Sequence, residues 1–265
     1  MNSPQHILLI DIGNTRAKWS FAPIDKSVSE VAFSSLFGHF YHSLNAPLDL
    51  TKLTSTPITP LAIVCVNVAN PSIEEKLQAE LQAIWSDIPW ISFKSSSNAL
   101  SIQNRYESPT SLGADRWAAI LGASQANPNK NILIVNAGTA STIDFLSDKN
   151  EYLGGWIIPG LDLMLNSLAS GTAALPDLDA EQANSSLNQL GQSTEQAILA
   201  GCLNAQVGAI SMALTNNPKI DTIVLSGGNS NAIENLLKRQ LPASINLQLD
   251  SYLVLRGLYA WFKAQ

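Results

Sequence analysis

A short motif occurs twice in this 265-residue chain, and the repeat restricts the fold more than any other feature. The copies are ILLIDIGNTRAKWSF at residues 7–21 and ILIVNAGTASTIDFL at residues 132–146, which aligns Asp11 with Asn136. Each copy has an apolar run, a turn of small polar residues and a second run, as in two strands joined by a tight turn. The repeat predicts two similar α/β lobes that begin in the same way. The alternative is that such turns recur by chance.

The rest of the chain also has an α/β pattern. Residues 61–68, LAIVCVNV, form an all-apolar run that is typical of a strand buried on both faces. Apolar residues at helical spacing follow Pro71. We place the domain boundary at a helix that begins near Gly113. The predicted lobes are residues 1–116 and 117–265, and the last helix is expected to pack back on the first lobe. Further helices are expected near 160–171, 192–214, 229–240 and 251–263, and strands at 222–226 and 245–249.

Composition argues against several classes of function. Fifteen basic and twenty-one acidic residues give a net charge of −6, and no cluster of Lys and Arg with interleaved aromatic residues forms a nucleic-acid footprint. Cys65 and Cys202 have neither metal-type spacing nor a disulfide framework, which fits a reducing compartment. The start of the sequence lacks an export signal, and no window is expected to reach the length of a membrane span. We expect a cytoplasmic protein with no nucleic-acid or membrane partner.

The first copy of the motif has the chemistry of a phosphate-binding turn. Backbone N–H groups and short hydroxyls in GNTRAK can approach a phosphate closely, and Lys18 adds a point charge. Asp11, at the strand end, would hold Mg²⁺ while Asn14, Thr15 and Lys18 contact the phosphates. The alternative is a hairpin turn whose aspartate makes local backbone hydrogen bonds. Neither GxxxxGK[ST] nor a GxGxxG between strand and helix is present, so a nucleotide site would be of another kind.

The segment GADRW at residues 113–117 places an acid beside an arginine near a helix start. Asp115 could act as general base for a substrate hydroxyl, and Arg116 could bind a carboxylate or stabilise phosphate charge. The alternative is a first-turn acid favoured by the helix dipole beside a solvated arginine.

A third glycine-rich segment, SGGN, joins a predicted strand to a helix. At Gly227 and Gly228 the missing side chains would let an adenine or ribose lie against the backbone, although a helix-capping turn would have the same residues. His6, His39 and His42 share no catalytic or metal-type spacing, and we interpret them as ordinary residues.

Four segments in order resemble the type III pantothenate kinases, which belong to the actin, sugar-kinase and heat-shock ATPase superfamily. They are DIGNTRAK, GADR, NAGTASTID and GGWIIPG, and STEQAILAG and Tyr106 extend the resemblance through nearly the whole chain. The resemblance implies two similar ribonuclease-H-like lobes with a nucleotide cleft between them. It also implies transfer of the ATP γ-phosphate to pantothenate, which gives 4'-phosphopantothenate in the first step of coenzyme A biosynthesis.

The resemblance further implies roles for individual residues. Asp115 would be the general base, Asp11 the Mg²⁺-associated acid, and Thr139 a contact from the second lobe. The family is dimeric, so a homodimer is expected, with Thr194 near the subunit contact. The implied ATP-binding residues are Asp11, Ile12, Gly13, Asn14, Thr15, Arg16, Ala17, Lys18 and Thr139. The implied pantothenate-binding residues are Tyr106, Gly113, Ala114, Asp115, Arg116 and Thr194.

One position departs from the family pattern. Where the family has DAGTA, with an aspartate that helps to bind an activating K⁺ or NH₄⁺, this chain has Asn136. An amide keeps one oxygen and loses the charge, which at about 4 Å and an effective dielectric near 20 is worth roughly 4 kcal/mol before desolvation. We therefore expect a weakened or altered dependence on the monovalent cation, and Mg²⁺ that relies mainly on Asp11.

Two other functions stay open at this point. Asn136 is compatible with a weakened family member that acts as a regulatory or binding protein, although the retained Asp11 and Asp115 argue against complete loss of catalysis. Another small-molecule kinase of the superfamily, acting on acetate or a sugar, is the second alternative. Tyr106 and Thr194 at the expected positions weigh against it.

Overall fold

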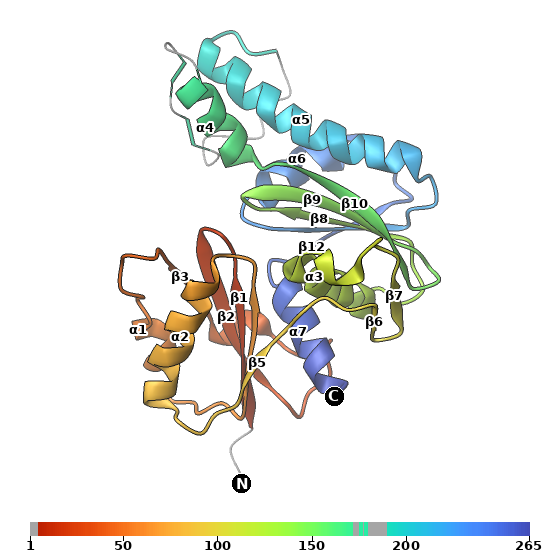
Figure 1. Ribbon diagram of the computed structural model, residues 1–265. Helices are drawn as coiled ribbons and strands as arrows, with labels where there is room; N and C mark the ends of the chain where they lie inside the picture. Colours follow the sequence, from red (N-terminus) through yellow and green to blue (C-terminus); the bar gives the residue numbers. More distant parts are fainter. Residues whose placement is uncertain (1–4, 172–174, 177, 180–189) are drawn as a thin grey trace. The chain divides into compact units, whose positions relative to one another are not determined.

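The computed structural model describes residues 5–171, 175–176, 178–179 and 190–265, and the chain forms two compact units (Figure 1). Unit 1 comprises Met1–Pro128, Asn150–Tyr152 and Tyr252–Gln265, and unit 2 comprises Asn129–Lys149 and Leu153–Ser251. Each unit is built around its own mixed sheet and its own hydrophobic core.

Unit 1 has a five-stranded sheet in the order β3-β2-β1-β4-β5. Strands β1 and β2 form an antiparallel hairpin, β3 extends it on the β2 side, and β4 and β5 lie parallel to β1. The strands are β1 (His6–Ile12), β2 (Arg16–Pro23), β3 (Phe37–Tyr41), β4 (Ile63–Asn67) and β5 (Trp90–Ser92). The central strands β1 and β4 are apolar on both faces because helices cover both faces of this sheet.

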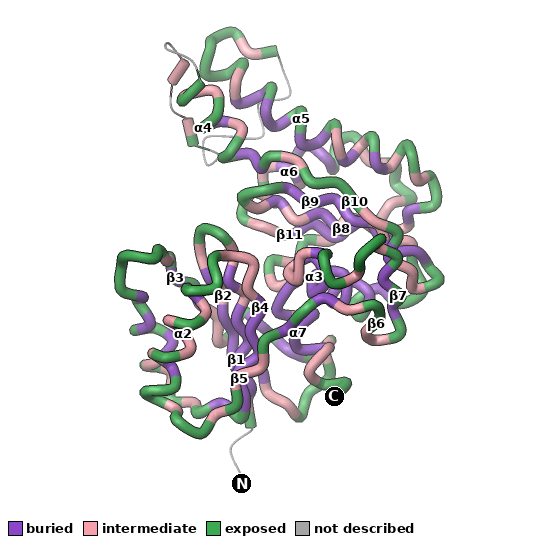
Figure 2. Tube along the Cα trace, in the orientation of Figure 1, coloured by how far each residue is buried: buried purple, intermediate pink, exposed green. Residues whose placement is uncertain are grey.

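The two faces of the unit 1 sheet are covered by different helices. Alternate residues of β1, among them Leu8 and Ile10, pack in a core with α2 (Pro71–Ile84), which begins where the Asn70 side chain accepts the Ser72 N–H. The opposite face contacts α3 (Ala114–Ala126) and α7 (Leu253–Lys263). The buried strands between these layers are visible in Figure 2. The short elements of unit 1 are η1 (Phe33–Leu36), α1 (Thr51–Thr54), β6 (Asn98–Ala99), β7 (Ile102–Asn104) and η2 (Pro109–Ser111).

Unit 2 repeats the strand order of unit 1. The second sheet has seven strands in the order β12-β11-β8-β9-β10-β7-β6. Its strands β10-β9-β8-β11-β12 repeat the order of the unit 1 sheet, so β8 takes the place of β1, β9 that of β2 and β11 that of β4. Three helices pack on one face of it. The bounds are β8 (Ile132–Ala137), β9 (Ala140–Leu146), β10 (Glu151–Pro159), β11 (Thr222–Ser226), β12 (Asn246–Leu249), α4 (Leu161–Gly171), α5 (Thr194–Asn216) and α6 (Ser230–Gln240). The predicted pair of similar ribonuclease-H-like lobes is confirmed by this common order.

The repeated motif forms the same hairpin in both units. In unit 1 the Gly13 N–H donates to the Arg16 carbonyl oxygen at 3.2 Å, and in unit 2 the Gly138 N–H donates to the Ala140 carbonyl oxygen at 3.2 Å. The second turn is therefore one residue shorter than the first. The motif repeats as a structural unit, with a tighter turn in the second copy.

The division between the units falls after Pro128, not after residue 116 as the sequence suggested. The helix start was a poor boundary because α3 runs unbroken to Ala126 and buries Trp117 and Ile120 in unit 1. Unit 1 also includes Tyr152 at the start of β10, which pairs with β7. Helix α7 belongs to unit 1 and packs along α3.

The expectation that no segment has the length of a membrane span is wrong for α5. Among the described residues, α5 is the one helix long and apolar enough to cross a membrane by length and composition, and half of its most apolar window is buried. Leu199, Leu203, Val207 and Ile210 of α5 lie in the unit 2 core. This burial is typical of a core helix.

Helices α3 and α7 approach closely because glycines lie at their crossing. A Cβ atom at Gly257 would overlap the carbonyl oxygen of Ala118, and one at Gly122 would overlap the carbonyl oxygen of Leu253. We predict that Gly257→Ala lowers the free energy of unfolding by about 3 kcal/mol, since backbone at a helix crossing yields little to added volume. Urea unfolding measures this effect.

The matched control for that substitution is Gly208→Ala on the exposed side of α5, where an added Cβ meets nothing within 4 Å. It should raise stability by up to about 1 kcal/mol, because alanine loses less conformational entropy in a helix. Equal effects of the two substitutions would show that the crossing is not tightly packed.

Candidate active site

The β1–β2 hairpin places an acid and a lysine on one face of the unit 1 sheet. Asp11 alternates with the residues that face α2, so its side chain lies on the face that α3 and α7 cover. Lys18 is the register partner of Asp11, and paired residues of antiparallel strands project to the same face. Asn14 and Thr15 are exposed at the turn that joins the two strands. The hairpin therefore joins an acid, a base and a small polar turn.

A second carboxylate comes from the first turn of α3. Gly113 precedes the helix, and the Asp115 Oδ1 accepts the backbone N–H of Arg116 at 2.8 Å. Asp115 is partly buried. Because α3 covers the sheet face on which Asp11 lies, the two carboxylates share one region of unit 1.

Burial and a neighbouring carboxylate both disfavour the charged form of Asp11. Burial raises the pKa of the Asp11 carboxyl from 3.8 to about 6, Lys18 lowers it, Asp115 raises it and Arg16 lowers it. The two cationic side chains do not offset burial and the neighbouring carboxylate. A cation bound beside Asp11 would relieve this cost.

Arg116 is buried with two tyrosines and is not solvated, so that alternative from the sequence is wrong. Its side chain is 5% exposed, and Nη2 donates to the Tyr152 hydroxyl at 3.0 Å. The guanidinium carbon lies 5.9 Å from the centre of the Tyr106 ring, which stacks on the Tyr152 ring at 6.1 Å and 25°. Sequence reasoning missed Tyr152, because a tyrosine in an apolar strand has no signal that distinguishes it from a core residue.

Unit 2 carries the three other residues that the sequence proposed. Asn136 is partly buried at the end of β8, and its register partners are Thr142 on β9 and Ser226 on β11. These three side chains project to the same face and all carry neutral oxygens. Thr139 is exposed in the turn after β8, and Thr194 is exposed at the first residue of α5.

The SGGN segment is explained by its approach to β8. Gly227 has φ +99°, and a Cβ there would overlap the carbonyl oxygen of Ala137, to which the Asn229 N–H donates at 3.1 Å. The Asn229 side chain makes no capping hydrogen bond to α6 and donates instead to Asp162 Oδ2 at 2.9 Å. The segment holds the end of β8 against α4 and α6.

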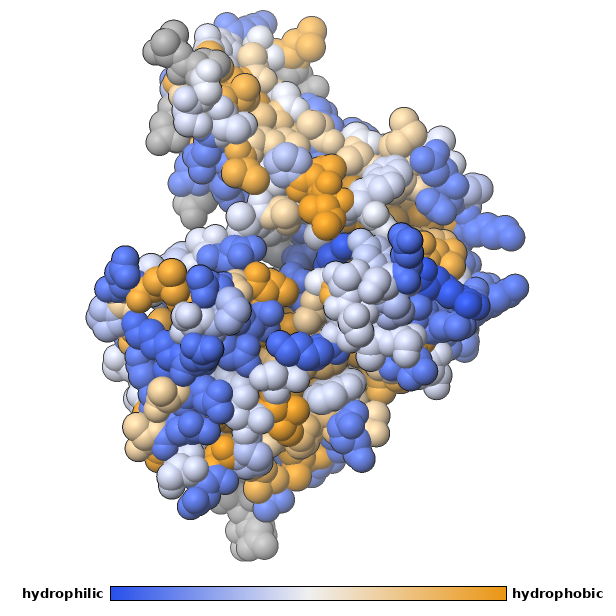
Figure 3. Space-filling view, viewed as in Figure 1, coloured by the Kyte–Doolittle hydropathy of each residue, from blue (hydrophilic) through white to orange (hydrophobic). Residues whose placement is uncertain are grey.

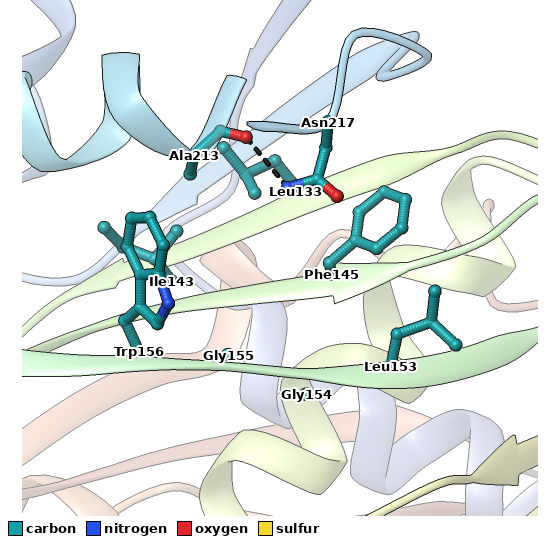
Figure 4. Close-up of a pocket in the computed structure, with 9 residues that line it drawn as sticks. All are labelled: Leu133, Ile143, Phe145, Leu153, Gly154, Gly155, Trp156, Ala213 and Asn217. Carbon is teal, nitrogen blue, oxygen red and sulfur yellow. Dashed lines mark hydrogen bonds between the residues drawn. The ribbon is translucent and has the colours of Figure 1, made fainter. Parts of the chain in front are cut away.

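A separate pocket of about 220 Å³ lies in unit 2, between the sheet and the end of α5 (Figure 4). Leu133, Phe145 and Trp156 line it, and Asn217 donates from Nδ2 to the Ala213 carbonyl oxygen at 2.9 Å. All nine residues that line this pocket are non-ionisable. It therefore has no acid or base for proton transfer.

The described part of the chain has no group of three or more His, Cys, Asp and Glu residues that could hold a metal ion. Mg²⁺ does not need such a group, since it is usually bound by one or two carboxylates together with substrate phosphates. The Asp11 and Asp115 carboxylates fit that type of site.

A family model and a curated relative both show similarity to type III pantothenate kinases. The family model described as type III pantothenate kinase matches residues 7–216. A type III pantothenate kinase of Aromatoleum aromaticum is 36% identical over 254 residues, which cover 95% of this chain and 96% of the relative.

Solved structures show similarity of fold alone. One is an activator of 2-hydroxyisocaproyl-CoA dehydratase from Clostridium difficile with bound ADPNP. It matches with a TM-score of 0.56 at 11% identity, and the match covers 98% of this chain and 94% of the activator chain. A glucokinase from an Antarctic psychrotroph matches with a TM-score of 0.52 at 15% identity, and the match covers 99% of this chain and 100% of the glucokinase chain.

Proposed function

The chain belongs to the type III pantothenate kinase family, and we propose that unit 1 carries the base and the phosphate-binding turn of its reaction. That reaction uses ATP to phosphorylate the hydroxyl of pantothenate and gives 4'-phosphopantothenate for coenzyme A biosynthesis. The observation that carries the proposal is the placement of Asp11, at the end of β1, on the sheet face covered by α3, whose first turn carries Asp115. Two such carboxylates, one for the metal side and one for the acceptor, are what phosphoryl transfer to an alcohol requires.

In this proposal Asp115 is the general base. An alcohol is a weak nucleophile at neutral pH, so Asp115 takes the hydroxyl proton of pantothenate as its oxygen attacks the γ-phosphorus. The bond between that phosphorus and the bridging oxygen breaks, and ADP leaves. The hydrogen bond from the Arg116 N–H holds the Asp115 carboxylate in one orientation during this step.

The ATP phosphates bind at the hairpin of unit 1 in this proposal. Asp11, the turn and Lys18 supply a metal-side acid, backbone N–H groups and a cation, and the family resemblance adds Thr139 to the phosphate-binding residues. Mg²⁺ beside Asp11 would supply neutralising charge to the phosphates, and the raised pKa of Asp11 supports this position. The other residues of the segment, Ile12, Gly13, Arg16 and Ala17, form the hairpin itself.

Pantothenate binds beside the start of α3 in this proposal. Gly113, Ala114 and Arg116 are neighbours of Asp115 in sequence, and the Tyr106 ring lies 5.9 Å from the Arg116 guanidinium carbon. Arg116 suits the pantothenate carboxylate. The hydrogen bond to Tyr152 fixes the direction of the buried guanidinium, which supports a binding role. The family resemblance also assigns Thr194 to pantothenate binding.

We also propose a monovalent cation site at Asn136, with altered K⁺ or NH₄⁺ dependence. The neutral oxygens of Asn136, Thr142 and Ser226 on one sheet face suit a singly charged ion but supply no countercharge. Asn136→Asp should therefore lower the K⁺ concentration for half-maximal activity by about tenfold. This effect is smaller than the roughly 4 kcal/mol of attraction between two unit charges, because desolvation of the carboxylate and the ion offsets most of it. Titration of K⁺ and NH₄⁺ in the kinase assay measures this, and identical activation curves would contradict it.

A homodimer is the proposed oligomeric state. Apolar residues reach the surface of unit 2 (Figure 3), and Leu153, Trp156, Ile157 and Leu163 are 40–60% exposed on β10 and α4. Exposed apolar side chains of this size support an interface with a second copy. Sedimentation equilibrium should give twice the 28.4 kDa chain mass, and a monomer at assay concentration would contradict the proposal. We place the enzyme in the cytoplasm, which the free thiols of Cys65 and Cys202 support.

The proposed function is tested by supplying purified protein with Mg·ATP and three acceptors in parallel. We expect one ADP per 4'-phosphopantothenate with pantothenate, and background ADP release with acetate or glucose. Mass spectrometry identifies the product. Phosphorylation of acetate or a sugar in place of pantothenate would contradict it, as would pantothenate binding without turnover across a range of K⁺ and NH₄⁺.

A further inference from the structure

A histidine outside all the motifs contacts the phosphate-binding turn. His42 directly follows β3, whose last residue, Tyr41, is the register partner of Arg16 at the start of β2. The His42 side chain is thereby brought beside the turn, where Nε2 lies 2.7 Å from the Gly13 carbonyl oxygen. A carbonyl oxygen only accepts, so Nε2 carries the hydrogen and donates.

This hydrogen bond fixes the orientation of a peptide plane in the turn. The Gly13 carbonyl and the Asn14 N–H belong to the same planar peptide, and in a trans peptide they point in opposite directions. Holding the carbonyl toward His42 therefore holds the Asn14 N–H away from it. Among the described residues this N–H has no hydrogen-bond acceptor, and Asn14 is exposed.

The peptide would be free to rotate without that contact. Gly13 has no Cβ, so rotation of the peptide that follows it meets little steric resistance. The Gly13 N–H is held by the Arg16 carbonyl oxygen, but that bond constrains the preceding peptide and not the Gly13–Asn14 one. His42 is the contact on the carbonyl side of the Gly13–Asn14 peptide.

We infer that His42 is a positioning residue for the nucleotide phosphates, because it holds the Gly13–Asn14 peptide with its N–H directed outward to the ligand. The inference rests on the proposed role of the turn in binding ATP. Backbone N–H groups that point at a common ligand are a frequent way to bind phosphate, and their affinity depends on orientation fixed in advance. His42 supplies that orientation from a neighbouring strand.

Calorimetric titration with Mg²⁺ and a non-hydrolysable ATP analogue tests this inference independently of turnover. His42→Leu removes the donor and should weaken analogue binding about five- to tenfold, the value of one hydrogen bond. His42→Gln keeps an N–H donor and should remain within about threefold of wild type. His6→Leu is the matched control, since His6 lies at the other end of β1, and it should bind as wild type does.

Kinetics with both substrates separate positioning from general damage to the fold. His42→Leu should raise the KM for Mg·ATP by a similar factor and leave the KM for pantothenate unchanged. Equal analogue binding by His42→Leu and wild type, or a Gln variant as weak as the Leu variant, would overturn the inference and leave the kinase function standing. Absence of analogue binding to folded wild type would contradict the proposed function and this inference together.

Discussion

Replacement of Asp11 with asparagine is expected to abolish most pantothenate phosphorylation and yet to stabilise the folded protein at pH 8. The pKa of the Asp11 carboxyl is raised from 3.8 to about 6 by burial, with a further contribution from Asp115. A raised pKa means that the folded state holds the proton more tightly than the unfolded state does. Stability is therefore lost as the pH rises from about 4 to about 6, and the whole cost is present at pH 8.

The size of this effect follows from the shift. About two pKa units at 1.36 kcal/mol each correspond to up to about 3 kcal/mol. Asp11→Asn removes the charge, so urea unfolding in metal-free buffer should show a gain of that order at pH 8 and little difference at pH 3.5. Asp148→Asn, at an exposed position, is the control and should change stability by less than about 0.5 kcal/mol.

The same substitution should lower kcat by about 10²–10³, the usual loss when one electrostatic contact to a reacting group is removed. An active-site group that costs stability and is needed for activity is a common trade-off. No stabilisation at pH 8 would show that Asp11 is well solvated or already neutralised. Full activity of Asp11→Asn would remove Asp11 from the proposed metal side of the site.

Asp115→Asn is expected to lower kcat by about 10²–10⁴, the range for loss of a positioned general base. The asparagine keeps the size of the side chain and an oxygen that can accept the Arg116 N–H, so the start of α3 should keep its structure. The KM values for ATP and pantothenate should therefore change little. Steady-state kinetics of both variants, with circular dichroism as the control for folding, check this result.

Much of the fold was predictable because its signals are local. The repeat at Asp11 and Asn136 predicted two similar lobes, and the helices expected near 192–214 and 251–263 match α5 and α7 to within a few residues. The family resemblance implied two ribonuclease-H-like lobes, which the strand order common to both units confirms. The boundary after residue 116 was wrong, because a helix start is a local signal and the division of units depends on which sheet the helix packs against.

The surroundings of the site residues were less predictable because they come from distant segments. Whether Arg116 is solvated or buried depends on Tyr152, which lies 36 residues away in sequence and belongs to no motif that the sequence analysis identified. His42 contacts a main-chain oxygen, and any residue type at position 13 would offer the same atom. Sequence reasoning therefore identified which residues carry charge but not what holds them in place.

The most direct test of Asp115 as the general base is the rate of the chemical step in a single turnover. With enzyme in excess over γ-labelled Mg·ATP and saturating pantothenate, rapid quenching gives the rate of label transfer to 4'-phosphopantothenate. Asp115→Asn is expected to bind as much labelled ATP as wild type does and to transfer the labelled phosphoryl group at least about 100-fold more slowly. Transfer at the wild-type rate by the folded variant would contradict the assignment of Asp115 as the base.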